Sequence, residues 1–319
     1  MARFDARFEL EDSLAMRDDD GNSALRIVLG ATFYLPAGFD RGAAFDAING
    51  IASVITENLR WAKNTTTFDW ELLESGNVKS YLSQASSVRP DQELEFGLRS
   101  GDVSSEATDF SISGLFLASW QSDPSYFKFT VPITFFADRD DAFVSLVKST
   151  IQKCPPLHGY GGLMIAEAQN RNILQKFEPI VYSIAQRFMG LEVDRPYSHL
   201  AYVPSGIKSV NWLTFVDHKL IYNKPEIATW LEKPTLETIK TGRIGSTVFV
   251  QSGERPEIGD KQKQRYPTAY VETAKQLKSI KITLHRSFHS GLPGRFTRET
   301  SEEWLQRLEQ FTERDRASA

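Results

Sequence analysis

The sequence predicts an α+β fold in which a mixed, largely antiparallel sheet, or more than one, packs against helices. Strand-like and helix-like segments alternate along the 319 residues without a long linker or low-complexity tract. Consecutive strand-like segments are joined by short turns, which is typical of an antiparallel meander. Hairpin and helical connections occur together, and this combination favours α+β over a strictly alternating parallel sheet.

The first half of the chain gives the clearest elements. Residues 25–35 are β-branched and aromatic and end in a Pro-Ala-Gly turn, so we expect a strand there. Residues 43–59 carry apolar side chains three and four apart, which predicts a helix that Gly50 weakens but does not end. The meander strands are expected at 93–99, 108–120 and 125–136, and a second amphipathic helix at 141–154, before Pro155-Pro156.

The second half continues the mixture. Strands are expected at 161–166, 210–216 and 247–251, and helices at 178–189 and 269–277. Residues 300–303 have the form of a capping box and precede an apolar stripe at helical spacing, which predicts a last helix. The stretches that begin at Gly30 and Pro132 resemble each other and suggest a duplicated β-α unit, with a chance match of short patterns as the alternative.

We divide the chain into an N-terminal segment, 1–24, a core domain, 25–282, and a basic segment with a C-terminal amphipathic helix, 283–319. A formal net charge of −4 argues against a protein that coats nucleic acid or an anionic membrane. One cysteine excludes an internal disulfide framework and a multi-cysteine metal site. Neither a secretory signal nor an apolar run long enough to cross a membrane is evident, so we expect a cytoplasmic protein.

Charge is distributed unevenly. Residues 255–298 hold ten Lys or Arg side chains against three acids, which indicates either a solvated face or a surface for a partner. Two acidic turns are candidate contacts with a basic partner, and solvated loops are the alternative interpretation. Their members are Asp18, Asp19 and Asp20 in the first turn, and Asp138, Asp140 and Asp141 in the second.

No catalytic or cofactor constellation is assembled by the sequence. Cys154 and His158 lie four residues apart, but the intervening prolines prevent a shared helix, so a nucleophile pair is weakly supported. The glycine-rich run after His158 lacks the G-x-S-x-G elbow of esterases, and its glycines are expected to permit a tight turn and close packing. The remaining histidines show no metal-ligand spacing, and TGRIGST lacks a phosphate-loop ending.

Three motifs follow one another along the chain. They are Pro155-Pro156-Leu157-His158-Gly159-Tyr160-Gly161-Gly162, Gly206-Ile207-Lys208-Ser209-Val210-Asn211-Trp212-Leu213-Thr214-Phe215 and Gln251-Ser252-Gly253-Glu254-Arg255-Pro256-Glu257-Ile258-Gly259-Asp260, accompanied by Phe33-Tyr34-Leu35-Pro36 and by Tyr126 with Pro132. In this order and spacing, they resemble the TsiV-type family of type VI secretion immunity proteins. The resemblance spans about residues 25–280. It implies a non-catalytic protein that binds a cognate toxin delivered between bacteria, and relatives of this kind often accompany restriction-endonuclease-like nucleases.

This resemblance, together with the lack of a catalytic constellation, favours an immunity protein that occludes a cytoplasm-acting nuclease toxin. No cofactor, metal, membrane, small-molecule substrate or direct nucleic-acid contact is expected. The motif residues His158, Tyr160, Lys208, Asn211 and Trp212 can serve packing or partner binding, and the sequence leaves both open. Two alternatives remain: a hydrolase that uses Cys154 or His158, and a nucleic-acid-binding module that uses 255–298.

Overall fold

One large sheet organises the chain. The computed structural model describes residues 14–73, 77–136, 139–282, 288 and 295–311, and within them eleven strands and seven α-helices confirm the α+β class. The strands are β1 Met16–Arg17, β2 Ser23–Leu35, β3 Trp61–Lys63, β4 Trp70–Leu72, β5 Leu94–Arg99, β6 Ser111–Phe116, β7 Ser125–Pro132, β8 His158–Glu167, β9 Leu213–Asp217, β10 Ile239–Ile244 and β11 Thr247–Ser252. The helices are α2 Arg41–Ile55, α3 Val78–Ser86, α4 Asp140–Lys153, α5 Arg171–Arg187, α6 Pro225–Glu232, α7 Thr268–Gln276 and α8 Arg298–Leu305.

The sheet is antiparallel at every neighbouring pair of its main path. Its order is β10-β11-β9-β8-β2-β7-β6-β5-β3-β4, with β1 added to β2. The predicted meander is present as β5, β6 and β7. The long strand β2 lies at the centre and pairs with β7 on one side and with β8 on the other.

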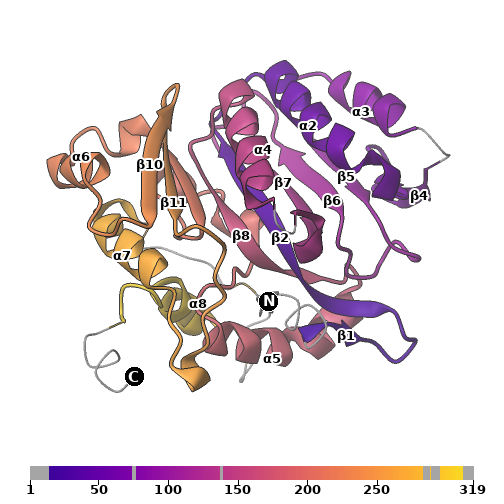
Figure 1. Cartoon of the computed structure of the whole chain (residues 1–319). Coiled ribbons are helices and arrows are strands. Elements are labelled where there is room, and N and C mark those ends of the chain that lie inside the picture. The colour runs from indigo at the N-terminus through magenta and orange to yellow at the C-terminus, as the bar shows by residue number, and fades with distance from the viewer. Residues whose placement is uncertain (1–13, 74–76, 137–138, 283–287, 289–294, 312–319) are drawn as a thin grey trace.

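Side chains that alternate along β2 separate two layers of the core. Leu29, Ala31 and Phe33 belong to a cluster with the apolar residues of α2, α3 and α4, which lie together over one face of the sheet (Figure 1). Val28 and Tyr34 point to the opposite face and join a smaller cluster there. This period of two is what a strand buried on both faces requires.

The first turn of helix α2 is capped by the residue that precedes it. The Asp40 carboxylate accepts hydrogen bonds from the backbone N–H groups of Gly42 and Ala43, at 2.8 and 3.2 Å, and so caps the first turn. Gly50 lies inside the helix, as predicted. The nearest atom to a β-carbon built there is the Lys153 ammonium of α4, 3.3 Å away at the end of a flexible side chain, so this turn of α2 faces α4.

The glycine-rich run after His158 is not a tight turn, and that prediction is wrong. Residues 158–167 form β8, in the middle of the sheet. Gly159 lies between Phe33 of β2 and Phe215 of β9, whose ring centroids are 5.0 Å apart. The Phe215 ring and the backbone oxygen of Thr32 fill the space that a side chain at 159 would need, so close packing explains the glycine.

Two helices begin earlier than the sequence analysis expected. Helix α5 begins at Arg171, because the Asn170 side chain caps its first turn, and Pro179 is accommodated inside it. Helix α8 begins at Arg298. Its capping box is formed by Thr297 and Thr300, three residues before the predicted one, while Trp304 and Leu305 are buried as expected.

The duplicated β-α unit stays a prediction. Strands β2 and β7 are each followed by a helix, and α2 and α4 pack against each other. The matched residues differ in structure, however: Thr32 to Leu35 are in β2, whereas Ile133–Phe136 form a 3-10 turn after β7.

Candidate functional site

The five motif residues that the sequence singles out lie in the interior. His158, Tyr160, Lys208, Asn211 and Trp212 have no exposed surface. The Trp212 indole N–H donates to the backbone oxygen of Gly253 at 3.1 Å, and its ring stacks on Phe143 of α4. These contacts hold the start of β9 and the loop after β11 against the core, so the geometry favours packing as the role of Trp212.

Asn211 shapes the backbone around it. Its side-chain oxygen accepts a hydrogen bond from the Trp212 N–H at 2.7 Å. The same oxygen would lie 2.1 Å from a β-carbon at position 162, so Gly162 provides the space that Asn211 occupies. A side chain of the motif at 206–215 thus fills the space beside a glycine of the motif at 155–162, which explains why both motifs occur in one chain.

Tyr160 and Lys208 belong to a buried polar network. The Tyr160 hydroxyl donates to an Asp194 carboxylate oxygen at 2.7 Å and accepts from the Lys208 ammonium at 3.1 Å. Thr32 donates to the same Asp194 oxygen at 3.0 Å, and Lys128 pairs with the other at 2.8 Å. Burial raises the pKa of Asp194, but the charges of Lys128 and Lys208 and these hydrogen bonds outweigh it, so the net shift is downward.

The network continues toward the C-terminal part of the chain. Lys208 lies 2.7 Å from a carboxylate oxygen of Glu192, and Arg307 lies 3.8 Å from the other. Arg307 also donates to the backbone oxygen of Met189 at 2.7 Å. Alternating charges therefore connect the sheet to the segment after α8, and each charge is stabilised by an opposite neighbour.

Cys154 and His158 do not form a nucleophile pair. The ring nitrogen Nδ1 of His158 is hydrogen-bonded to the backbone oxygen of Phe215 at 3.2 Å. Burial lowers the pKa of His158 to about 3 and raises the pKa of Cys154 to about 12. A thiol with a raised pKa stays protonated at neutral pH, and within the described residues no hydrogen bond joins it to a base, so the geometry gives the hydrolase alternative no support.

Replacing Cys154 with alanine should leave unchanged the protection that the resemblance to immunity proteins leads us to expect. The buried thiol contributes packing, and its loss should cost no more than about 1 kcal/mol of folding free energy. Survival of toxin-exposed cells that carry the variant measures this. Loss of protection by a variant that still folds would restore the hydrolase interpretation.

The acidic turns lie at different places in the fold. Asp18 accepts from the backbone N–H groups of Asp20 and Asn22, and the exposed Asp19 pairs with Lys176 of α5 at 2.6 Å. In the second turn, Asp140 begins α4 and Asp141 is exposed, while Asp138 lies outside the described residues. Asp20 is exposed as well, and the role of these turns as partner contacts stays a prediction.

The basic segment 255–298 does not form one free cationic face. Lys281 is buried and pairs with Glu309, Arg295 pairs with Glu178 at 2.7 Å, and Arg298 pairs with Glu302 at 3.3 Å. Arg286 lies outside the described residues. Several of these cations therefore stabilise the C-terminal part of the fold, which weakens the nucleic-acid-binding alternative.

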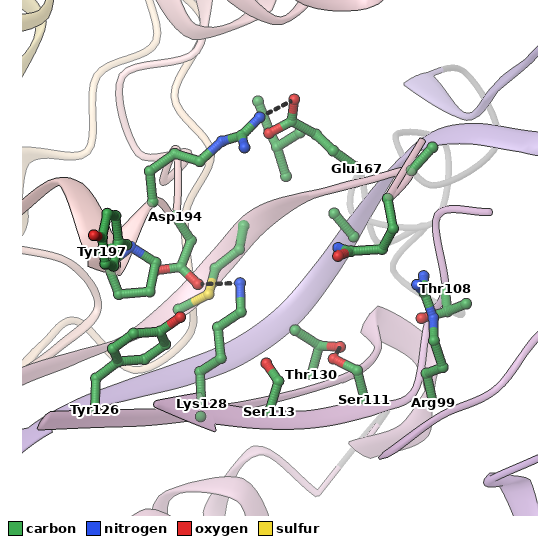
Figure 2. Close-up of a pocket in the computed structure, with 18 of the residues that line it drawn as sticks. Arg99, Thr108, Ser111, Ser113, Tyr126, Lys128, Thr130, Glu167, Asp194 and Tyr197 are labelled. Carbon is green, nitrogen blue, oxygen red and sulfur yellow. Dashed lines mark hydrogen bonds and ion pairs between the residues drawn. The ribbon is translucent and has the colours of Figure 1, made fainter. Parts of the chain in front are cut away.

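A pocket on the sheet was not expected from the sequence. A cavity of about 350 Å³ lies on the face of β5, β6 and β7 opposite α2 and α4. Figure 2 shows its floor as a row of polar side chains, with Arg99 and Thr108 at one end and Tyr126, Asp194 and Tyr197 at the other. The floor between them is made by Ser111, Ser113, Lys128 and Thr130.

One sequence signal could have revealed this floor. In SISGLF of β6 and SYFKFTVP of β7, polar residues alternate with apolar ones, which is typical of strands with one face in contact with water. The other side chains that complete the pocket come from residues 167 and 194–198 of the same chain, far from β6 and β7 in sequence. Only the sheet topology brings them together.

No membrane-spanning or metal-binding group occurs in the described part of the chain. Its helices are all too short or too polar to cross a bilayer. Within the same residues, no three side chains among His, Cys, Asp and Glu cluster as metal ligands would.

Comparisons with known proteins give a family and a fold. The sequence model of the TsiV family, described as type VI immunity for VRR-NUC, matches residues 45–308. Among solved structures, the Pseudomonas aeruginosa T6SS protein PA0821 is similar with a TM-score of 0.81 and 20% identity, over 98% of this chain and 94% of that chain. Among curated proteins, none matches.

Proposed function

Because the chain belongs to the TsiV family of type VI immunity proteins for VRR-NUC, we propose that it neutralises its nuclease toxin by binding and occlusion rather than by catalysis. The family match over most of the chain is the observation that carries this proposal. The buried Cys154 and His158 support a role without catalysis, since neither is placed as a nucleophile or base. The protein would act in the cytoplasm, where a nuclease reaches nucleic acid.

Such binding should follow the rules of stable protein interfaces. A specific complex buries about 800 Å² on each partner, and an inhibitor of a damaging enzyme needs nanomolar affinity or better. The exposed acids Asp19, Asp20 and Asp141 are proposed contacts with a basic surface of the toxin. Acidic side chains there would also speed association, because opposite charges steer the encounter.

Co-purification with the VRR-NUC toxin encoded by the neighbouring gene tests the proposal. We expect a complex of fixed stoichiometry that survives gel filtration at micromolar concentration and abolishes nuclease activity. Failure to form this complex would contradict occlusion.

Replacing Asp19, Asp20 and Asp141 together with asparagine should slow association about tenfold at low salt and much less at 0.5 M salt. The exposed pair Glu232 and Glu237, replaced with glutamine, is the matched control and should have little effect. Association rates from surface plasmon resonance at two salt concentrations measure the difference. Equal effects of the two sets would show that these turns are not contacts.

A further inference from the structure

Arg99 is a buried cation that lines the pocket and forms no ion pair within the described residues. It lies on β5 and is 4% exposed. Its Nη2 group donates to the backbone oxygen of Glu106, but Nε and Nη1 have no hydrogen-bond partner among the described residues. The Trp70 ring lies over the guanidinium, 5.1 Å from its carbon to the ring centroid.

The other charges that line the pocket are paired. Lys63 pairs with Glu95, Lys128 with Asp194, and Arg195 with Glu167. The lining therefore holds four cations and three acids, a net charge of 4 − 3 = +1 that Arg99 supplies. The carboxylate of Glu106 attracts Arg99 from nearby, but it accepts hydrogen bonds from the backbone N–H groups of Ser23, Asp102 and Val103.

A buried arginine with unpaired donors costs folding free energy unless a ligand binds to it. A buried charge with unsatisfied donors lowers the stability of the folded chain, and burial also lowers the pKa of Arg99 to about 10. An anion that enters the pocket would satisfy the donors and balance the charge. Binding sites commonly accept such a cost in the free protein.

We propose that this pocket receives one carboxylate side chain of the VRR-NUC toxin and that Arg99 recognises it. The proposal rests on the proposed function and assigns part of the interface to the face of β5 to β7. One carboxylate matches one unpaired guanidinium, whereas a nucleic-acid strand would bring several phosphates toward three acids that already line the pocket.

The surroundings of the pocket suit a protein partner. Tyr197, which is 67% exposed, stands at one end of the pocket, as Figure 2 shows. On the neighbouring β3–β4 hairpin, Phe68 and Leu72 are 53% and 58% exposed. Aromatic and apolar side chains around a buried arginine are typical of the centres of protein interfaces.

The test compares Arg99→Met with Arg243→Met, which alters an exposed arginine on the edge strand β10. Isothermal titration of the full chain with the toxin should show affinity reduced about 30-fold or more for Arg99→Met and unchanged for Arg243→Met. Arg99→Lys should retain part of the affinity. Because Arg99→Met removes an unpaired buried charge, its urea midpoint should not fall below that of the unaltered protein.

Carboxyl labelling of the toxin with glycine ethyl ester locates the acid. At least one toxin carboxylate should be protected in the complex with the unaltered chain and become labelled again with Arg99→Met. No protected carboxylate would overturn the proposal. Binding of a labelled oligonucleotide that Arg99→Met abolishes would also overturn it, because the pocket would then take phosphate.

The outcomes distinguish a failure of the proposed function from a failure of the pocket assignment. If the unaltered chain does not bind the toxin, the proposed function fails. If it binds and Arg99→Met binds equally well, only the pocket assignment fails. If the affinity of Arg99→Met for the toxin and its urea midpoint both fall in proportion, Arg99 acts by stabilising the fold. The pocket assignment is then also overturned.

Discussion

Replacing Gly159 with alanine is expected to destabilise the protein by at least about 3 kcal/mol, which is a large share of the 5–15 kcal/mol that holds a typical domain together. The added β-carbon would lie 2.0 Å from the Phe215 ring and 2.4 Å from the backbone oxygen of Thr32. Side chains can move away from such a contact, but the Thr32 oxygen belongs to the central strand β2. Urea unfolding measures the change, and cells that carry the variant should lose protection.

Two further variants show whether the contact itself is the cause. Gly242→Ala, on the edge strand β10, is the matched control: a β-carbon there meets no atom within 4 Å, so stability should change by less than about 0.5 kcal/mol. Adding Phe215→Leu to Gly159→Ala should restore part of the loss, because the ring contact goes while the Thr32 contact stays. An unchanged urea midpoint for Gly159→Ala would show that β8 can shift within the sheet.

The fold was largely predictable because its elements are periodic in the sequence. The apolar spacing between residues 43 and 59 and the β-branched run before Pro36 predicted α2 and β2. The predictions failed where a tertiary contact overrides a local signal. Glycines normally indicate a turn, yet Gly159 and Gly162 lie in a strand because Phe215 and Asn211 occupy the space beside them.

The candidate site was much less predictable. The five motif residues all lie in the interior, but the sequence could not show that Lys208 is buried against Glu192, because most lysines are exposed. Arg99 carried no signal at all. Its position depends on the pairing of β5 with β3 and β6, and on the Trp70 ring that covers it. Sequence periodicity describes single strands, whereas a pocket depends on how distant strands meet.

Replacing Lys208 with methionine should destabilise the protein by about 3–5 kcal/mol, because a carboxylate would remain buried without its closest cation. Lys208 is fully buried and lies 2.7 Å from Glu192, and it also donates to the backbone oxygen of Val193 at 3.1 Å. Methionine has a similar length, so the cavity left behind is small. The loss therefore reports on charge rather than on packing, and urea unfolding measures it.

Two control variants show whether the unpaired Glu192 charge causes the loss of stability. Adding Glu192→Gln removes the stranded charge, so the double variant should be more stable than Lys208→Met alone by about 2 kcal/mol. Lys176→Met breaks the exposed pair with Asp19 and should cost less than about 1 kcal/mol, because solvent already screens both charges. If Lys208→Met costs no more than Lys176→Met, the buried charges are not what joins the C-terminal segment to the sheet. The hydrogen bond from Arg307 to the backbone oxygen of Met189 and the Lys281–Glu309 pair would then be among the polar contacts that join this segment to the rest of the fold.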